Sequence, residues 1–89
     1  MKTSVSLGAY GRTGIKELTK FVQKAEQLGV NTVWSAEAWG HDAVTCLAYL
    51  AGQTEKIRLG TGIMQISARV PSMTAMTALS MHDISDGRF

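Results

Sequence analysis

The chain has 89 residues, of which 45% are hydrophobic and 18% charged, and its formal net charge is +2. This length suits one small domain, and the composition excludes a disordered chain. No apolar run approaches the ~20 residues of a membrane-spanning helix, and the amino terminus has too short an apolar core for a signal peptide. The single cysteine, Cys46, cannot form an intramolecular disulfide. We therefore expect a cytoplasmic protein without a membrane partner.

The basic residues are scattered along the sequence, and one row of them falls on a predicted helix. Lys16, Lys20 and Lys24 form this row, and Glu17 and Glu26 interleave with it. Mixed charges of this kind are typical of a solvated helix face. We expect no nucleic-acid partner.

Three short strands alternate with three amphipathic helices. We expect strands over residues 4–7 and 30–35, a third strand with its kinked exit over residues 57–66, and helices over residues 15–28, 43–54 and 71–84. Gly29 is a natural left-handed stop, Asp42 a helix N-cap and Pro71 a first helical residue. The methionines of the last helix are expected to serve as packing material. This alternation predicts an α/β fold with right-handed crossovers and a parallel sheet.

The end of the sequence, Arg88-Phe89, resembles the start of a fourth strand. A parallel sheet needs both faces covered, and three strands leave open edges. A closed barrel of such units takes about 250 residues. We therefore expect residues 1–89 to form a single partial domain, which is a fragment or associates with another copy through its open sheet edges.

Two glycines, Gly60 and Gly62, lie one residue apart at the exit of the third predicted strand. Glycine inside a strand indicates a bend or the close approach of another group. One interpretation is a strand end that presents backbone groups to a ligand. The other is a bulge with no ligand.

Parallel sheets bind ligands at the carboxyl ends of their strands. Three segments have that position: residues 8–14, 36–41 and 61–69. Their candidate side chains are Tyr10, Arg12, Glu37, Trp39, His41, Thr61, Gln65 and Arg69. Glu37 could act as a general acid or base. It could equally be a carboxylate at the approach to a helix, or an ion-pair partner of Arg69. His41, next to Asp42, fits an ordinary turn histidine.

Several common sites do not fit this sequence. The glycines at positions 8, 11 and 14 do not make a dinucleotide-binding fingerprint, because Ala9 stands where a glycine is required. No histidine-cysteine cluster indicates a metal site. No serine, histidine and acid follow one another in the order of a hydrolase triad.

Five runs along the chain resemble the luciferase-like monooxygenase superfamily, most closely its deazaflavin-dependent oxidoreductase branch. The runs are residues 33–45 (VWSAEAWGHDAVT), 47–51 (LAYLA), 57–63 (IRLGTGI), 73–78 (MTAMTA) and 85–89 (SDGRF). Together they cover essentially the whole chain in order. The resemblance implies a TIM barrel, of which these residues would be the amino-terminal portion and the first three strand-helix units.

The resemblance also implies a hydride-transfer enzyme that acts on a small organic substrate. Its cofactor would be coenzyme F-420, a deazaflavin, or alternatively FMN, with the ring at the carboxyl end of the barrel. A non-prolyl cis peptide at the end of the third strand backs this ring in the deazaflavin branch, and the matching pair here is Gly62-Ile63. The implied site has Glu37 as catalytic residue and no metal. Its cofactor-binding residues are Ala9, Glu37, Thr61, Gly62, Ile63 and Gln65.

One position departs from the family pattern. Many relatives carry an acid followed directly by a histidine at the end of the second strand. The acid matches Glu37, but Ala38 occupies the histidine position and His41 follows three residues later. A hypothesis of another class also stays open, because the fourth strand and the later segments that hold the cofactor's phosphate in this family are missing from these residues: the chain would then be a non-catalytic barrel fragment that self-associates.

Overall fold

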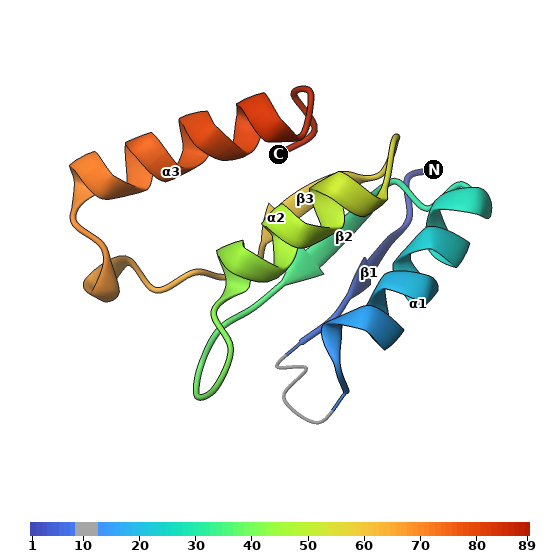
Figure 1. Cartoon of the computed structure of the whole chain (residues 1–89), viewed down its shortest axis with the longest axis horizontal. Helices are drawn as coiled ribbons and strands as arrows, with labels where there is room; N and C mark the ends of the chain where they lie inside the picture. Colours follow the sequence, from blue (N-terminus) through green and yellow to red (C-terminus); the bar gives the residue numbers. More distant parts are fainter. Residues whose placement is uncertain (9–12) are drawn as a thin grey trace.

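The computed structural model describes residues 1–8 and 13–89 (Figure 1). Its elements are β1 (Ser4–Ser6), α1 (Ile15–Gln27), β2 (Thr32–Ser35), α2 (Ala43–Gln53), β3 (Arg58–Thr61), a 3-10 helix η1 (Ile66–Ala68) and α3 (Pro71–Ile84). The sheet has the order β1-β2-β3, and both strand pairs are parallel. The prediction of a parallel α/β fold built from strand-helix units is confirmed.

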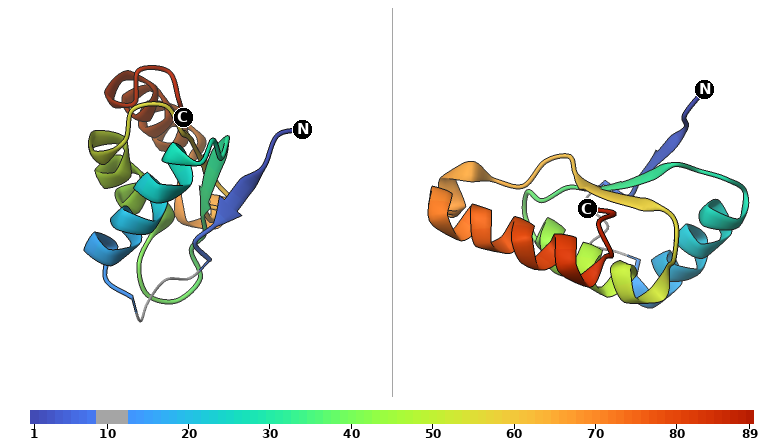
Figure 2. Two further views of the ribbon diagram at one scale, coloured as in Figure 1. Left: turned by 90° about the vertical axis from the view of Figure 1, so that its right-hand side faces the viewer. Right: turned by 90° about the horizontal axis from the view of Figure 1, so that it is seen from above.

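All three helices lie on the same side of the sheet (Figure 2). Helix α2 lies between α1 and α3 and packs against both β2 and β3. The core between the helices and the sheet contains Val22, Val33, Leu47, Leu50 and Leu59, each at most 3% exposed. No described element covers the opposite face of the sheet, which we call the open face.

Local sequence signals set the ends of the helices as predicted. The Asp42 carboxylate accepts a hydrogen bond of 3.0 Å from the N–H of Thr45 and so caps α2. Pro71 is the first residue of α3. Gly29 follows α1 with a φ of 84°, in the left-handed region that glycine enters without a steric penalty.

The third strand has the predicted irregular exit: the chain leaves the regular sheet after Thr61 and forms η1 a few residues later. Past this point the exit of β3 bonds to the exit of β2. The N–H of Gly62 donates to the carbonyl of Ser35 at 2.8 Å, and the N–H of Glu37 donates to the carbonyl of Ile63 at 3.2 Å. These bonds keep the two strand exits side by side without a regular strand.

The packing prediction for the methionines of α3 is correct for one residue and wrong for two. Met81 is 2% exposed, whereas Met73 and Met76 are 48% and 53% exposed. Helix α3 packs against α2, and no other described element covers the rest of its surface (Figure 1). Apolar spacing alone therefore did not tell which methionines are buried.

The last residues of the chain lie beside β3. The N–H of Leu59 donates to the carbonyl of Arg88 at 2.9 Å, a backbone contact of the kind that a fourth strand would make, although no regular strand forms there. The Arg88 guanidinium donates to the carbonyl of Ala51 and the hydroxyl of Thr54, both at 2.8 Å. Arg88 thus fastens the end of α3 to the end of α2.

The turn between α2 and β3 is organised by Glu26 of α1. One oxygen of its carboxylate accepts the backbone N–H groups of Glu55, Lys56 and Ile57 at 3.0, 2.7 and 2.8 Å. Burial opposes the ionisation of Glu26, but these three hydrogen bonds outweigh it and lower the pKa of the carboxyl. The carboxylate therefore ties the first helix to the entry of the third strand.

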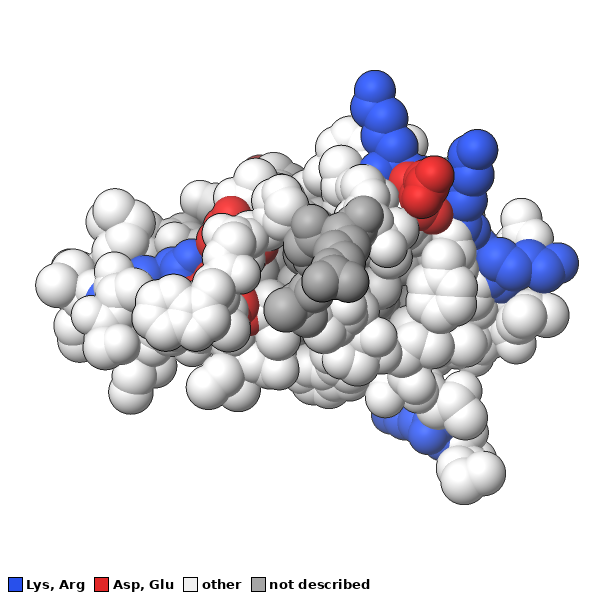
Figure 3. Space-filling view, turned by 90° about the horizontal axis from the view of Figure 1, so that it is seen from below, with Lys and Arg blue, Asp and Glu red and all other residues white. Residues whose placement is uncertain are grey.

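The lysines of α1 lie on a solvent-exposed face of the helix, as predicted. Lys16, Lys20 and Lys24 are all exposed. Lys and Arg side chains project separately at the end of the molecule where α1 lies, with an acidic side chain among them (Figure 3). Within residues 1–8 and 13–89, no helix combines the length and the apolar character that crossing a membrane requires.

Candidate functional site

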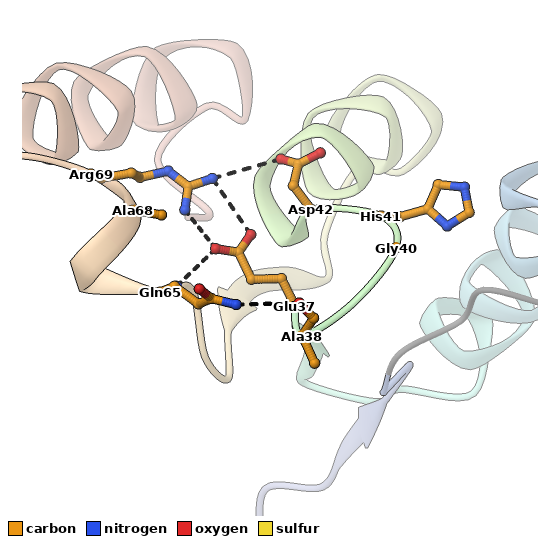
Figure 4. Close-up of a pocket in the computed structure, with 8 residues that line it drawn as sticks. All are labelled: Glu37, Ala38, Gly40, His41, Asp42, Gln65, Ala68 and Arg69. Carbon is orange, nitrogen blue, oxygen red and sulfur yellow. Dashed lines mark hydrogen bonds and ion pairs between the residues drawn. The ribbon is translucent and has the colours of Figure 1, made fainter.

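The candidate site lies where the exits of β2 and β3 meet. Two of the three predicted strand-end segments, residues 36–41 and 61–69, come together there (Figure 4). The third, residues 8–14, is described only in part, so the predicted residues Ala9, Tyr10 and Arg12 lie outside the described residues.

Glu37 joins three segments of the chain through its carboxylate. One oxygen, Oε1, accepts the N–H of Gln65 at 2.8 Å and Nη1 of Arg69 at 2.7 Å. The other, Oε2, accepts the N–H of Ala43, the first residue of α2, at 2.8 Å. The exit of β2, the start of α2 and the segment after β3 therefore share one carboxylate (Figure 4).

The electrostatics of this pair favour the charged forms of both side chains. The hydrogen bond from Arg69 is the main reason why the pKa of Glu37 falls from 4.5 to about 2, against the opposing effect of burial. The same bond raises the pKa of Arg69. The Glu37 and Arg69 side chains are only 9% and 18% exposed, and Asp42 lies 3.8 Å from the guanidinium. Glu37 is consequently ionised at neutral pH.

Both structural alternatives considered for Glu37 occur together. The carboxylate approaches the start of α2, as a helix-approach residue does, and it pairs with Arg69. A negative charge at a helix N-terminus is favourable because the first N–H groups of the helix lack internal partners. A proton-transfer role for Glu37 stays a prediction.

A cavity of about 300 Å³ borders this network. Its lining residues are Glu37, Ala38, Gly40, His41, Asp42, Gln65, Ala68 and Arg69. The Gln65 side chain donates to the carbonyl of Ala38 at 3.3 Å. The His41 ring points away from the Glu37 carboxylate (Figure 4). His41 thus does not occupy the place of a histidine that directly follows the acid.

The peptide between Gly62 and Ile63 is cis, so the bond implied by the family resemblance is confirmed. Ile63 is 71% exposed at this strand end, and Gln65 is exposed as well. Thr61 has a different position: it pairs with Ser35 and shares the helix-covered face with the buried Leu59. Of the predicted cofactor-binding residues, Thr61 therefore ends β3 on the helix-covered face, whereas Gly62, Ile63 and Gln65 follow the strand.

Gly60 and Gly62 lie against the indole ring of Trp34. A Cβ built on Gly60 would overlap the ring, and one on Gly62 would lie 3.5 Å from Cε3 of Trp34. The close approach that the glycines indicated is therefore made by a side chain of the protein itself. Sequence reasoning missed Trp34, because its contact with Gly60 depends on the strand register, which only the structure gives.

Among residues 1–8 and 13–89, no group of three or more His, Cys, Asp and Glu side chains could hold a metal ion.

Comparison with known proteins relates this chain to one enzyme family. The family model described as luciferase-like monooxygenase matches residues 2–89. The chain is 43% identical over 88 residues to a protein of Mycobacterium tuberculosis (strain ATCC 25618 / H37Rv) that is named, provisionally, as a coenzyme F-420-dependent oxidoreductase. It is 32% identical over 75 residues to a 5,10-methylenetetrahydromethanopterin reductase of Methanolobus tindarius. These alignments cover 99% and 83% of this chain but 25% and 23% of the relatives, so the chain spans about a quarter of their length.

Two solved structures resemble the fold closely. The coenzyme F-420-dependent tetrahydromethanopterin reductase from Methanopyrus kandleri superposes with a TM-score of 0.87 at 25% identity, over 98% of this chain and 25% of that chain. A monooxygenase from Streptomyces bottropensis gives a TM-score of 0.86 at 26% identity, over 99% of this chain and 31% of that one. Both are TIM-barrel proteins of the luciferase-like type, which confirms the prediction of a partial barrel. Because the family model spans nearly the whole chain, this chain belongs to the luciferase-like monooxygenase family.

Proposed function

We propose that this chain supplies part of the ring site of an oxidoreductase that transfers a hydride between coenzyme F-420 and an organic substrate. The observation that carries the proposal is the identity of 43%, over 99% of the chain, with a relative named for coenzyme F-420. The fold similarity to a coenzyme F-420-dependent reductase supports it independently. The assignment of residues 1–89 to one partial barrel domain, and of the protein to the cytoplasm, stays a prediction.

The residues at the strand exits fit a flat ring. Gly62 is exposed and Ile63 is 71% exposed beside it, so a planar group can reach the backbone at this point. When bound, a deazaflavin supplies the ring carbon that accepts or releases the hydride. Gly62 and Ile63 would support the ring, with Gln65 beside them. The resemblance also implies Ala9, which lies outside the described residues, and Thr61, which shares the helix-covered face with Leu59.

Glu37 is best suited to holding the segment after Ile63 in position. Its carboxylate holds the N–H of Gln65 and the guanidinium of Arg69, and so fixes the backbone that follows Ile63. A general acid works best with a pKa near the operating pH, whereas the pKa of Glu37 is about 2. We propose that Glu37 acts through its bonded neighbours, which keep the ring-supporting backbone in place.

Two other functions have an observation in their favour. The family description and the second solved structure are those of monooxygenases, which favours FMN as the alternative cofactor. The open face of the sheet and the half-exposed Met73 and Met76 favour a non-catalytic fragment that self-associates. In that case a homo-oligomer would bury these surfaces.

A titration of the 89-residue chain with coenzyme F-420 and, separately, with FMN tests the proposal. Cofactor fluorescence and near-ultraviolet circular dichroism would report binding. We expect saturable binding of the deazaflavin and weaker binding by G62V, whose side chain would crowd the proposed ring site. G52A is the matched control, because a Cβ at Gly52 meets no atom within 4 Å.

Each outcome of the titration selects one function. Binding of FMN alone would replace the deazaflavin proposal with the monooxygenase alternative. Binding of neither cofactor, together with a stable oligomer in sedimentation velocity, would overturn both enzyme proposals for this chain and favour the self-associating fragment.

A further inference from the structure

We infer that the indole of Trp34 is a contact surface for the planar ring of the cofactor, at the carboxyl ends of β2 and β3. The cofactor-binding residues that the family resemblance implies do not include Trp34. The inference rests on the proposed function, because it assigns a further residue to the same ring site.

The strand register places Trp34 on the open face of the sheet. Trp34 pairs with Gly60, while its neighbours Val33 and Ser35 are fully buried on the helix-covered side. Successive side chains of a strand point to opposite faces. The indole therefore lies on the face that no described element covers, and Trp34 is 41% exposed there.

The indole reaches from the regular part of β3 to its exit. Ring atoms of Trp34 are the nearest neighbours of a Cβ built on Gly60 and also of one built on Gly62. Gly62 is directly followed by Ile63, the exposed residue proposed to support the ring. The aromatic surface thus extends up to the strand end where the cofactor is proposed to bind.

The two glycines leave room for the indole beside the neighbouring strand. At Gly60 any side chain would occupy the space of the ring and displace the indole. The indole, with Trp34 41% exposed, keeps apolar ring surface accessible on the open face. Planar aromatic groups bind such surfaces in offset stacks.

A simpler alternative is that Trp34 only fills space inside the barrel. The two roles differ in one measurable property. A stacked indole perturbs the visible absorption band of the bound cofactor and induces circular dichroism in it, whereas a tryptophan that only packs leaves both unchanged. Phe21 provides a control, since it is also aromatic, is 50% exposed and lies on α1, on the opposite side of the sheet from the indole.

The experiment compares W34L, W34F and F21L with the unmodified chain, each titrated with coenzyme F-420. Equilibrium dialysis gives the affinity, and the visible absorption and circular dichroism of the bound cofactor give the stacking signature. We expect F21L to match the unmodified chain. We expect W34L to bind about two- to tenfold more weakly and to lose the signature, and W34F to recover part of both.

G60A keeps both tryptophans and is the second variant. Its new Cβ displaces the indole, so we expect the same loss of the visible signature as in W34L. Far-ultraviolet circular dichroism identifies the variants that remain folded.

The failure of this inference differs from the failure of the proposed function. If the folded W34F and G60A variants bind with unchanged affinity and unchanged visible spectra, Trp34 does not contact the ring, although the chain still binds the deazaflavin. If the unmodified chain binds no deazaflavin, the proposed function is overturned, and the assignment of Trp34 falls with it.

Discussion

The guanidinium of Arg69 lies 2.7 Å from the carboxylate of Glu37, although the two residues are 32 positions apart in the sequence. The pair connects the segment after β3 with the exit of β2. Because Glu37 also accepts the first N–H of α2, the position of the candidate site depends on this one carboxylate.

The acid stability of the chain should depend on Glu37. Its pKa is about 2 in the folded chain and 4.5 when unperturbed, so the folded state favours the ionised form. The stabilisation is fully present above pH 4.5 and is lost as the pH falls from 4.5 to about 2. We expect E37Q to be about 1–3 kcal/mol less stable than the unmodified chain at pH 7.

Urea unfolding at several pH values measures this difference. The gap between E37Q and the unmodified chain should narrow as the pH falls through this interval. The lowered pKa of Glu26 also makes the chain less stable at low pH, and it does so in both chains. Only the difference in stability between E37Q and the unmodified chain therefore reports on Glu37. A gap that stays constant down to pH 2 would show that the Glu37 carboxylate is not stabilised by its neighbours.

Substitutions of two glycines should have opposite effects on stability. A Cβ at Gly60 would overlap the Trp34 ring, so we expect G60A to cost about 1–3 kcal/mol. Gly52 lies in α2 with open space around it, so we expect G52A to stabilise the chain by about 0.5–1 kcal/mol. Thermal unfolding would measure both. An unchanged melting temperature in G60A would contradict the observed packing of the indole.

Removal of the Glu26 carboxylate should loosen the turn before β3. The three N–H groups that it accepts lose their partner in E26A, and we expect a cost of about 1–2 kcal/mol in urea unfolding. E55A is the control, because the backbone N–H of Glu55 is kept when its exposed side chain is removed. If E26A and E55A lose the same amount of stability, the Glu26 carboxylate does not hold the turn.

The stability that the Asp42 N-cap gives to α2 should be measurable separately from the charge of Asp42. D42A removes the acceptor of the Thr45 N–H, and we expect it to cost about 1 kcal/mol. D42N keeps a capping oxygen and removes the charge, so it should retain most of the stability at neutral pH. If D42N is as unstable as D42A, the charge near Arg69 matters more than the cap.

Signals that act over a few residues were predictable from the sequence. The structure has Asp42 as the N-cap of α2 and Pro71 as the first residue of α3. It has Gly29, which tolerates a positive φ, just after the end of α1. The alternation of strands and helices likewise predicted the parallel sheet, because each crossover is a local unit.

Contacts between distant segments were harder to predict. The role of Glu26 depends on backbone groups about thirty positions away, and no local pattern announces such a contact. The reason for Gly60 depends on the strand register, which the periodicity of a single strand does not define. For Glu37, the sequence supplied the correct partners as alternatives but could not decide that both occur together.

The hydrogen bond from the Leu59 N–H to the Arg88 carbonyl links the middle of β3 to the residues that follow α3. An amide exchanges its hydrogen with solvent only when its bond opens. Exchange at Leu59 therefore reports whether the far end of α3 is attached to the sheet. Any change that detaches this helix, including the loss of the Arg88 side chain, would speed exchange at Leu59 even though β2 and β3 stay paired.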